Sequence, residues 1–183
     1  QPFGDANVMA TPRIVIVPSK NGRVVTGYSI ETGEAKSIRL ADDEAGGLTV
    51  DPVLGMSLAA LQLKGAAVDR IAVFSVTDGA WHPQDLAEAA NEAIPMIGPA
   101  IAVYCMGRRI YAFSVMANRW DVLELSKPLM PGEYPSVNVE MVTYVSPEDS
   151  RLHIFGAKNG KWTSIDVEKL PENDEPRKAI PAQ

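Results

Sequence analysis

The sequence combines short apolar segments with turn-forming residues, and one such combination occurs four times. In each copy an apolar stretch ends on an aromatic residue, a small residue follows directly, and a turn former comes five positions after the aromatic. The copies span residues 27–33, 73–79, 112–118 and 154–160, and their repeat aromatics are Tyr28, Phe74, Phe113 and Phe155. Repetition at intervals of about 40 residues is typical of an array of equivalent supersecondary units.

Each copy predicts a β-hairpin. The turns fall at residues 32–33, 78–79, 117–118 and 159–160, where Gly and Asn tolerate the positive φ of tight turns. Seven positions after the repeat aromatic, the second strand opens on a tryptophan in three copies and on Ala35 in the first; the tryptophans are Trp81, Trp120 and Trp162. Further strands are predicted upstream at 13–17, 57–63, 100–105 and 141–145, and a weaker pattern places a fourth strand within 48–54, 93–97 and 136–139.

Both faces of the strand before each turn are mostly apolar. A strand with one solvated face should alternate apolar and polar residues, so these strands are expected to be covered on both sides by stacked sheets. Residues 109–114 followed by Asn118-Arg119-Trp120 resemble a blade of a β-propeller, especially of the kelch and quinoprotein-like kinds. The resemblance covers roughly Arg13 to Leu170, and it implies architecture alone because the paired glycines of a kelch blade and a Trp-Asp pair are missing.

The predicted fold is therefore all-β, with four propeller-like repeats of three to four antiparallel strands. Four repeats fit a small propeller, while a partial ring completed by oligomerisation, a barrel or sandwich, an open array and a fragment of a longer propeller stay open. A single β-repeat domain is expected over residues 11–170, with repeats at about 11–47, 48–92, 93–133 and 134–170. Residues 1–10 and 171–183 are expected to be flexible, unless the first segment supplies a strand. A short helix is predicted over residues 85–93.

Charge and composition limit the classes of partner. The chain has 17 basic and 23 acidic residues, a net charge of −6, and no lysine- or arginine-rich block, which argues against nucleic-acid binding. No apolar run is long enough for a membrane span. Cys105 is the single cysteine and is expected to be a buried, unreactive thiol. The chain opens on Gln1, which is consistent with a processed leader and a periplasmic or secreted origin.

Candidate chemistry is sparse. Phosphate-binding glycine loops are absent, so no cofactor is predicted, and the two histidines, His82 and His153, fall in different copies, so no metal site is predicted. Recurring small residues and tryptophans are interpreted as structural. Three arginines recur four residues before the repeat aromatic, and they would bind an anion if they pointed into one channel; they are Arg70, Arg109 and Arg151.

The sequence thus favours a non-catalytic β-repeat module for protein interaction or self-assembly. The alternative is a small-ligand or carbohydrate-binding protein, or a hydrolase that uses carboxylates at the mouth of a ring. The carboxylates considered for that role are Asp69, Asp78, Asp121 and Asp149. Fold alone does not decide between these functions.

Overall fold

The computed structural model describes residues 7–39, 47–48, 52–64, 68–87 and 95–169, and these residues form four antiparallel β-sheets. The first sheet contains β1 (Met9–Ala10), β2 (Ile14–Pro18), β3 (Val24–Ser29) and β4 (Ala35–Arg39). The second contains β5 (Gly47–Leu48), β6 (Val53–Leu54), β7 (Leu58–Lys64), β8 (Arg70–Ser75) and β9 (Ala80–Asp85). The third contains β10 (Met96–Ile97), β11 (Ile101–Met106), β12 (Arg109–Ser114) and β13 (Arg119–Glu124). The last contains β14 (Ser136–Val137), β15 (Met141–Ser146), β16 (Arg151–Gly156) and β17 (Lys161–Asp166), and a 3₁₀ turn, η1 (Val167–Lys169), follows it.

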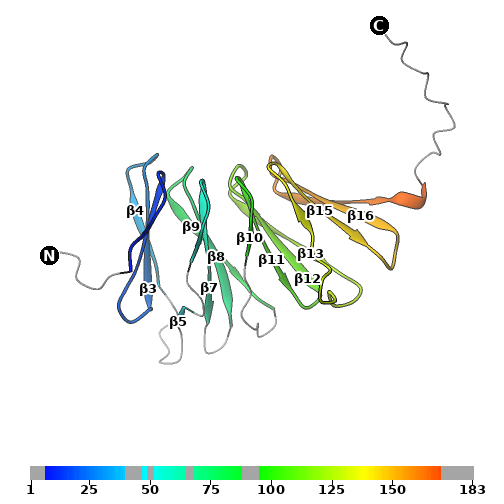
Figure 1. Ribbon diagram of the computed structural model, residues 1–183, viewed down its shortest axis with the longest axis horizontal. Helices are drawn as coiled ribbons and strands as arrows, with labels where there is room; N and C mark the ends of the chain where they lie inside the picture. Colours follow the sequence, from blue (N-terminus) through cyan, green and yellow to red (C-terminus); the bar gives the residue numbers. More distant parts are fainter. Residues whose placement is uncertain (1–6, 40–46, 49–51, 65–67, 88–94, 170–183) are drawn as a thin grey trace, which may run out of the picture.

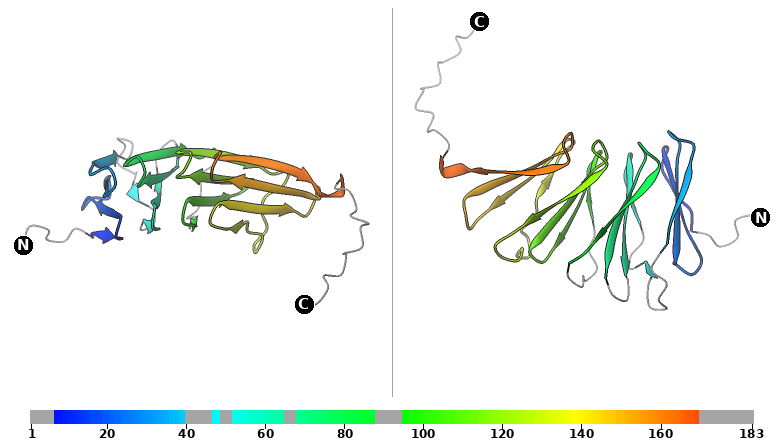
Figure 2. Two further views of the ribbon diagram at one scale, coloured as in Figure 1. Left: turned by 90° about the horizontal axis from the view of Figure 1, so that it is seen from above. Right: turned by 180° about the vertical axis from the view of Figure 1, so that it is seen from behind.

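The four sheets stand side by side in a row, in the order of the sequence (Figure 1). Each sheet repeats the same strand order, from a two-residue strand at one edge to a five- or six-residue strand at the other; in the second sheet both β5 and β6 pair with β7. The first and last sheets remain at opposite ends of the row in all three views (Figure 2). The prediction of four propeller-like repeats is confirmed, and the described sheets form an open arc.

The strand register confirms the predicted repeat. Phe74 lies opposite Trp81, Phe113 opposite Trp120 and Phe155 opposite Trp162, with ring centroids 5.2, 5.2 and 5.5 Å apart. Tyr28 lies opposite Ala35 in the same position. The turn residue has positive φ in every copy, at 69° for Gly33, 63° for Gly79, 46° for Asn118 and 59° for Gly160. The local hairpin chemistry therefore fixes four equivalent units.

The hydrophobic core of the described residues consists of three clusters, each between consecutive sheets. In the second, third and last sheets the repeat aromatic faces the sheet before it; Phe74, for example, packs with Ile14 and Ile16 of the first sheet. The strands β8 and β12 are buried on both faces, as predicted, because sheets cover them on either side. In β3 and β16 the expectation of two covered faces is wrong, because these strands belong to the end sheets. Tyr28 accordingly is 39% exposed, although it holds the same position as the buried phenylalanines.

Hydrogen bonds tie consecutive sheets together at the repeat positions. The hydroxyl of Ser29 donates to the carbonyl of Val76 at 2.6 Å, and the hydroxyl of Ser114 donates to the carbonyl of Ala157. In the opposite direction, the indole N–H of Trp81 donates to the carbonyl of Lys36 in the preceding sheet. The recurring serines and tryptophans are thus structural, as predicted, and they join neighbouring sheets.

Trp120 repeats this bond, because its indole N–H donates to the carbonyl of His82 at 2.9 Å. The junction between the third and last sheets differs. There the carboxylate of Asp121 accepts a bond from the backbone N–H of Trp162 at 2.7 Å. The buried indole N–H of Trp162 has no hydrogen-bond partner within the described part of the chain.

Several predicted segments turn out differently or lie outside the described residues. Met9 and Ala10 form β1 and pair with Ile16 and Val15, so this part of the N-terminal segment supplies a strand. Asp85, predicted to begin a helix, is the last residue of β9, and residues 88–93 of that segment are not described. The weaker fourth-strand pattern is confirmed, because β6, β10 and β14 fall within its intervals. Residues 1–6 and the tail at 171–183 lie outside the described ranges.

Candidate functional site

The three recurring arginines occupy one repeat position but are each engaged with an acid. Arg70 begins β8, and its Nε lies 2.6 Å from Oδ1 of Asp85 across the strand pair. Arg109 begins β12 and pairs with Glu124 at 3.2 Å. Arg151 begins β16, with Nε 4.0 Å from Oδ2 of Asp149. Each lies at the end of its sheet away from the tight turn, and their role as an anion-binding ring stays a prediction.

The four carboxylates of the hydrolase alternative are held in separate surroundings. Asp78 pairs with His82 at 2.9 Å in the turn of the second sheet, and Asp121 binds the backbone of the last sheet. Asp149 lies in the turn between β15 and β16, and Asp69 is buried just before β8. None of the four lines the cavity described below.

Metal and thiol chemistry find no support among the described residues. Those residues contain no group of three or more His, Cys, Asp or Glu side chains that could hold a metal ion. His82 packs against Phe113 with its ring tilted by 38° and the ring centroids 4.9 Å apart, and His153 is buried against Tyr144 in the last sheet. Burial raises the pKa of the Cys105 thiol to about 12, so this thiol stays protonated at neutral pH. The described part of the chain also has no helix with the length and apolarity of a membrane span.

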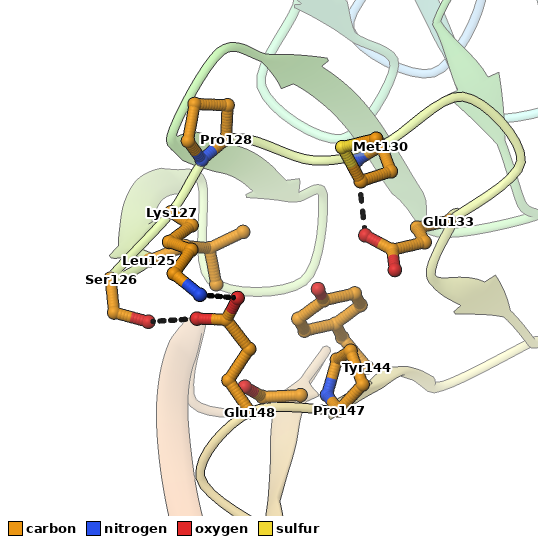
Figure 3. A pocket seen from close by; sticks show the side chains of 10 residues that line it. Leu125, Ser126, Lys127, Pro128, Met130, Glu133, Tyr144, Pro147 and Glu148 are labelled. Carbon is orange, nitrogen blue, oxygen red and sulfur yellow. Dashed lines mark hydrogen bonds and ion pairs between the residues drawn. The ribbon is translucent and has the colours of Figure 1, made fainter.

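A cavity of about 170 Å³ lies where the segment after the third sheet meets the last sheet (Figure 3). The segment at 125–133 lines one side, and the hairpin turn between β15 and β16 lines the other. The apolar part of the wall is made by Leu125, Pro128, Met130, Tyr144 and Pro147. The polar part is made by Ser126, Lys127, Glu133, Ser146 and Glu148.

Backbone hydrogen bonds hold the cavity wall in place. The N–H of Leu125 donates to the carbonyl of Arg108 at 2.8 Å, and the N–H of Leu129 donates to the carbonyl of Gly107 at 3.0 Å. Further along, the carboxylate of Glu133 accepts from the N–H of Met130 at 3.0 Å, while the N–H of Glu133 donates to the carbonyl of Met130. The segment is therefore pinned to the third sheet at one end and closed by a reciprocal turn at the other.

The ionisable groups of the cavity form a defined arrangement. The ammonium of Lys127 lies 2.6 Å from Oε1 of Glu148, and the hydroxyl of Ser126 donates to Oε2 of the same carboxylate at 3.1 Å. Tyr144 lies between Glu133 and Glu148, and its hydroxyl points into the cavity (Figure 3). Tyr144 is 7% exposed, and no described residue forms a hydrogen bond with its hydroxyl.

The pKa values follow from this arrangement. Burial raises the pKa of Tyr144, and the nearby carboxylates of Glu133 and Glu148 raise it further. The hydrogen bond from Lys127 lowers the pKa of Glu148, and a hydrogen bond from Ser146 lowers that of Asp149. At neutral pH the cavity therefore places a neutral phenol beside the ionised carboxylate of Glu148.

Exposed apolar side chains are frequent between the cavity wall and the end of β15. Five large ones fall within residues 130–145: Met130 (62% exposed), Tyr134 (67%), Val139 (61%), Met141 (45%) and Val145 (62%). A second hollow, lined by residues of 132–136 and 143–147, adjoins the cavity and shares Glu133, Tyr144 and Pro147 with it. Sequence reasoning missed this site, because residues 126–135 lie outside the repeated positions and Tyr144 has the pattern of a core strand. The proline and glycine content of 128–135 was the available signal.

The four sheets, with their shared register and inter-sheet packing, define a propeller-type β-repeat protein. No protein-family model matches the sequence, and no curated protein matches it. Among solved structures, Hsv2 from Kluyveromyces lactis is 14% identical and covers 91% of this chain and 53% of its own, with a TM-score of 0.41. A chain of the mitotic checkpoint complex is 12% identical and covers 80% of this chain and 46% of its own, with a TM-score of 0.37. Both neighbours are β-propellers, and this chain spans about half of their length.

Proposed function

We propose that this chain is a non-catalytic β-repeat module that binds a protein partner through the last sheet. The outer face of that sheet, defined as the face turned away from the third sheet, carries the observation that supports the proposal. Its residues in β15, β16 and β17 are Met141, Thr143, Val145, Leu152, Ile154 and Ile165. No described sheet lies against this face.

The equivalent face of the third sheet is part of the core. Ile101, Val103 and Ile110 hold there the positions that Met141, Thr143 and Leu152 hold in the last sheet, and all three are 0% exposed. The last sheet thus presents to solvent a surface with the pattern of an inter-sheet contact. Contiguous exposed apolar surface of this kind is typical of a protein-binding site.

The test compares two surface variants as baits. Val145→Lys places a charge on the outer face, and Ile30→Lys places the same charge on a residue of similar exposure in the turn of the first sheet. In quantitative affinity capture from the source cells, we expect Val145→Lys to lose a partner that the wild type and Ile30→Lys retain. If both variants retain every partner, the outer face is not the binding surface and the proposal is wrong.

Self-association is a second candidate, because the first sheet also has an apolar outer face. That face carries Val15, Val17, Thr26 and Tyr28. In the inner sheets the residues at the equivalent positions are covered by the sheet before them. A second copy could place this face against the last sheet, and light scattering over a range of concentrations would then report a mass above 19.7 kDa that Val145→Lys restores to the monomer. A mass that stays monomeric at all concentrations would exclude self-association, and a different protein would remain as the candidate partner.

A further inference from the structure

We infer that the cavity at Tyr144 receives a basic side chain, lysine or arginine, from the protein partner. This inference rests on the proposed function, because it assigns the chemistry of the residue that the partner places beside the outer face. The cavity opens next to that face, since the adjoining hollow includes Thr143 and Val145. A partner that covers Val145 therefore lies within reach of the cavity.

The charges of the cavity favour a cation. Its wall contains the carboxylates of Glu133 and Glu148 and a single ammonium, that of Lys127, which leaves one negative charge in excess. Lys127 and Ser126 engage both oxygens of Glu148. Glu133 is engaged by the N–H of Met130 through Oε2, and an incoming cation can bind its Oε1. The carboxylate of Asp149 adds to the negative potential at Tyr144.

The hydroxyl of Tyr144 gives an independent indication of a ligand. The side chain is more than nine-tenths buried, and its hydroxyl points into the cavity without a partner in the described structure. The hydroxyl is not one of the fully buried, unpaired side-chain atoms of the described residues, so solvent reaches it through the cavity and a ligand can reach it by the same opening. An ammonium or guanidinium group has several N–H donors, so it can donate to the Tyr144 oxygen and to Glu133 together.

The apolar wall matches the remainder of such a side chain. Lysine and arginine carry a stem of three or four methylene groups below the charged head, and these stems pack along apolar surface while the head keeps polar contacts. Leu125, Pro128 and Met130 provide that surface beside the carboxylates. A neutral aliphatic side chain would fill the same wall but would offer no donor to Oε1 of Glu133 or to the Tyr144 hydroxyl.

The experiment uses the full chain, labelled with ¹⁵N, and three short probes: the acetylated, amidated tripeptides Gly-Lys-Gly, Gly-Arg-Gly and Gly-norleucine-Gly. We expect the lysine or arginine peptide to shift the amide signals of residues 125–133 and 144–148 in a saturable way, and the norleucine peptide to leave them unchanged. Added salt should weaken the binding of the charged peptide. Equal shifts with norleucine would overturn the assignment of a basic side chain.

Two charge-removing variants give the matched control. Glu133→Gln keeps the shape of the wall and should weaken binding of the basic peptide by about tenfold or more, since it removes a charge-assisted hydrogen bond. Glu140→Gln removes an equal charge from an exposed position outside the cavity and should leave binding unchanged. The amide spectra show whether each variant is folded, and equal binding by both variants would overturn the inference.

Capture from the source cells separates this inference from the proposed function. If Val145→Lys loses the partner while Glu133→Gln retains it at wild-type level, the proposed function is supported. The inference that the cavity receives a basic side chain is then wrong. If Val145→Lys retains the partner, the proposed function fails, even if the cavity still binds the lysine peptide. If Val145→Lys and Glu133→Gln both lose the partner while Glu140→Gln retains it, the proposed function and the assignment of a basic side chain are both supported.

Discussion

Replacing Tyr104 by phenylalanine should stabilise the protein, although Tyr104 is part of the central core. Tyr104 lies in β11, is 0% exposed, and packs between the second and third sheets. Its hydroxyl has no hydrogen-bond partner within the described residues. An unpaired buried hydroxyl is unfavourable by about 1–3 kcal/mol, whereas the packing lost with one oxygen atom is worth a few tenths. We therefore expect a gain of about 1 kcal/mol at pH 7, or about 2–4 °C in Tm for a chain of this size.

Tyr111 provides the matched control, because it lies directly opposite Tyr104 in the strand register. It is also buried, at 3% exposed, but its hydroxyl accepts a hydrogen bond from the N–H of Ala87 at 3.5 Å. Tyr111→Phe should therefore lower the free energy of unfolding by about 0.5–1.5 kcal/mol. Urea denaturation followed by tryptophan fluorescence measures both variants, and the ring of Trp120 lies 6.3 Å from that of Tyr104.

Alkaline pH gives the same reasoning a second test. Burial raises the pKa of Tyr104 well above its usual value near 10. Above pH 10 the unfolded chain releases this proton while the native protein keeps it, so the unfolded state binds fewer protons and stability falls with rising pH. The contribution of one group is about 1.4 kcal/mol for each pH unit, and Tyr104→Phe should remove it. If Tyr104→Phe destabilises the protein at pH 7 and leaves the alkaline slope unchanged, the hydroxyl is paired and the reasoning is refuted.

Three further predictions concern the junctions and the last sheet. A Cβ added at Gly27 would lie 2.6 Å from the buried ring of Phe74, so Gly27→Ala should cost about 1–3 kcal/mol in urea denaturation; an unchanged midpoint would contradict this close approach. Ser114→Ala removes the donor to the carbonyl of Ala157 and should lower stability by about 1–2 kcal/mol, with calorimetry as the measurement. Burial lowers the pKa of His153, so the unfolded chain takes up a proton first as pH falls below about 6.5. Stability should thus decline from pH 7 towards pH 5, and a decline of the same size in His153→Gln would exclude His153 as its cause.

The repeated part of the fold could be predicted because its causes are local. A turn residue at positive φ, a tryptophan opposite an aromatic and an apolar strand before them are each set within about ten residues, and Gly79, Trp81 and Phe74 illustrate all three. Solvent exposure at the ends could not be predicted in this way. Tyr28 and Phe74 occupy one repeat position, and they differ because a sheet covers Phe74 and none of the described sheets covers Tyr28.

The candidate site was beyond sequence reasoning for a related physical reason. It is formed where a non-repeated segment folds back on the turn of the next sheet, so Glu133 and Glu148 meet through tertiary structure. Tyr144 has the apolar surroundings of any core strand residue, and only the missing partner of its hydroxyl distinguishes it. The recurring arginines were singled out by their periodicity. The structure gives that periodicity a structural reason, because Arg70 and Arg109 each form an ion pair with an acidic residue on the neighbouring strand.

Each end sheet lacks one of the side chains that join consecutive sheets. The last sheet has Gly156 at the position of Ser29 and Ser114, and the first has Ala35 at the position of the tryptophans. Copies stacked head to tail would therefore have neither the hydroxyl nor the indole donor at each new joint. Head-to-tail contacts that do not close generate fibres. The missing donors weaken that route to polymerisation.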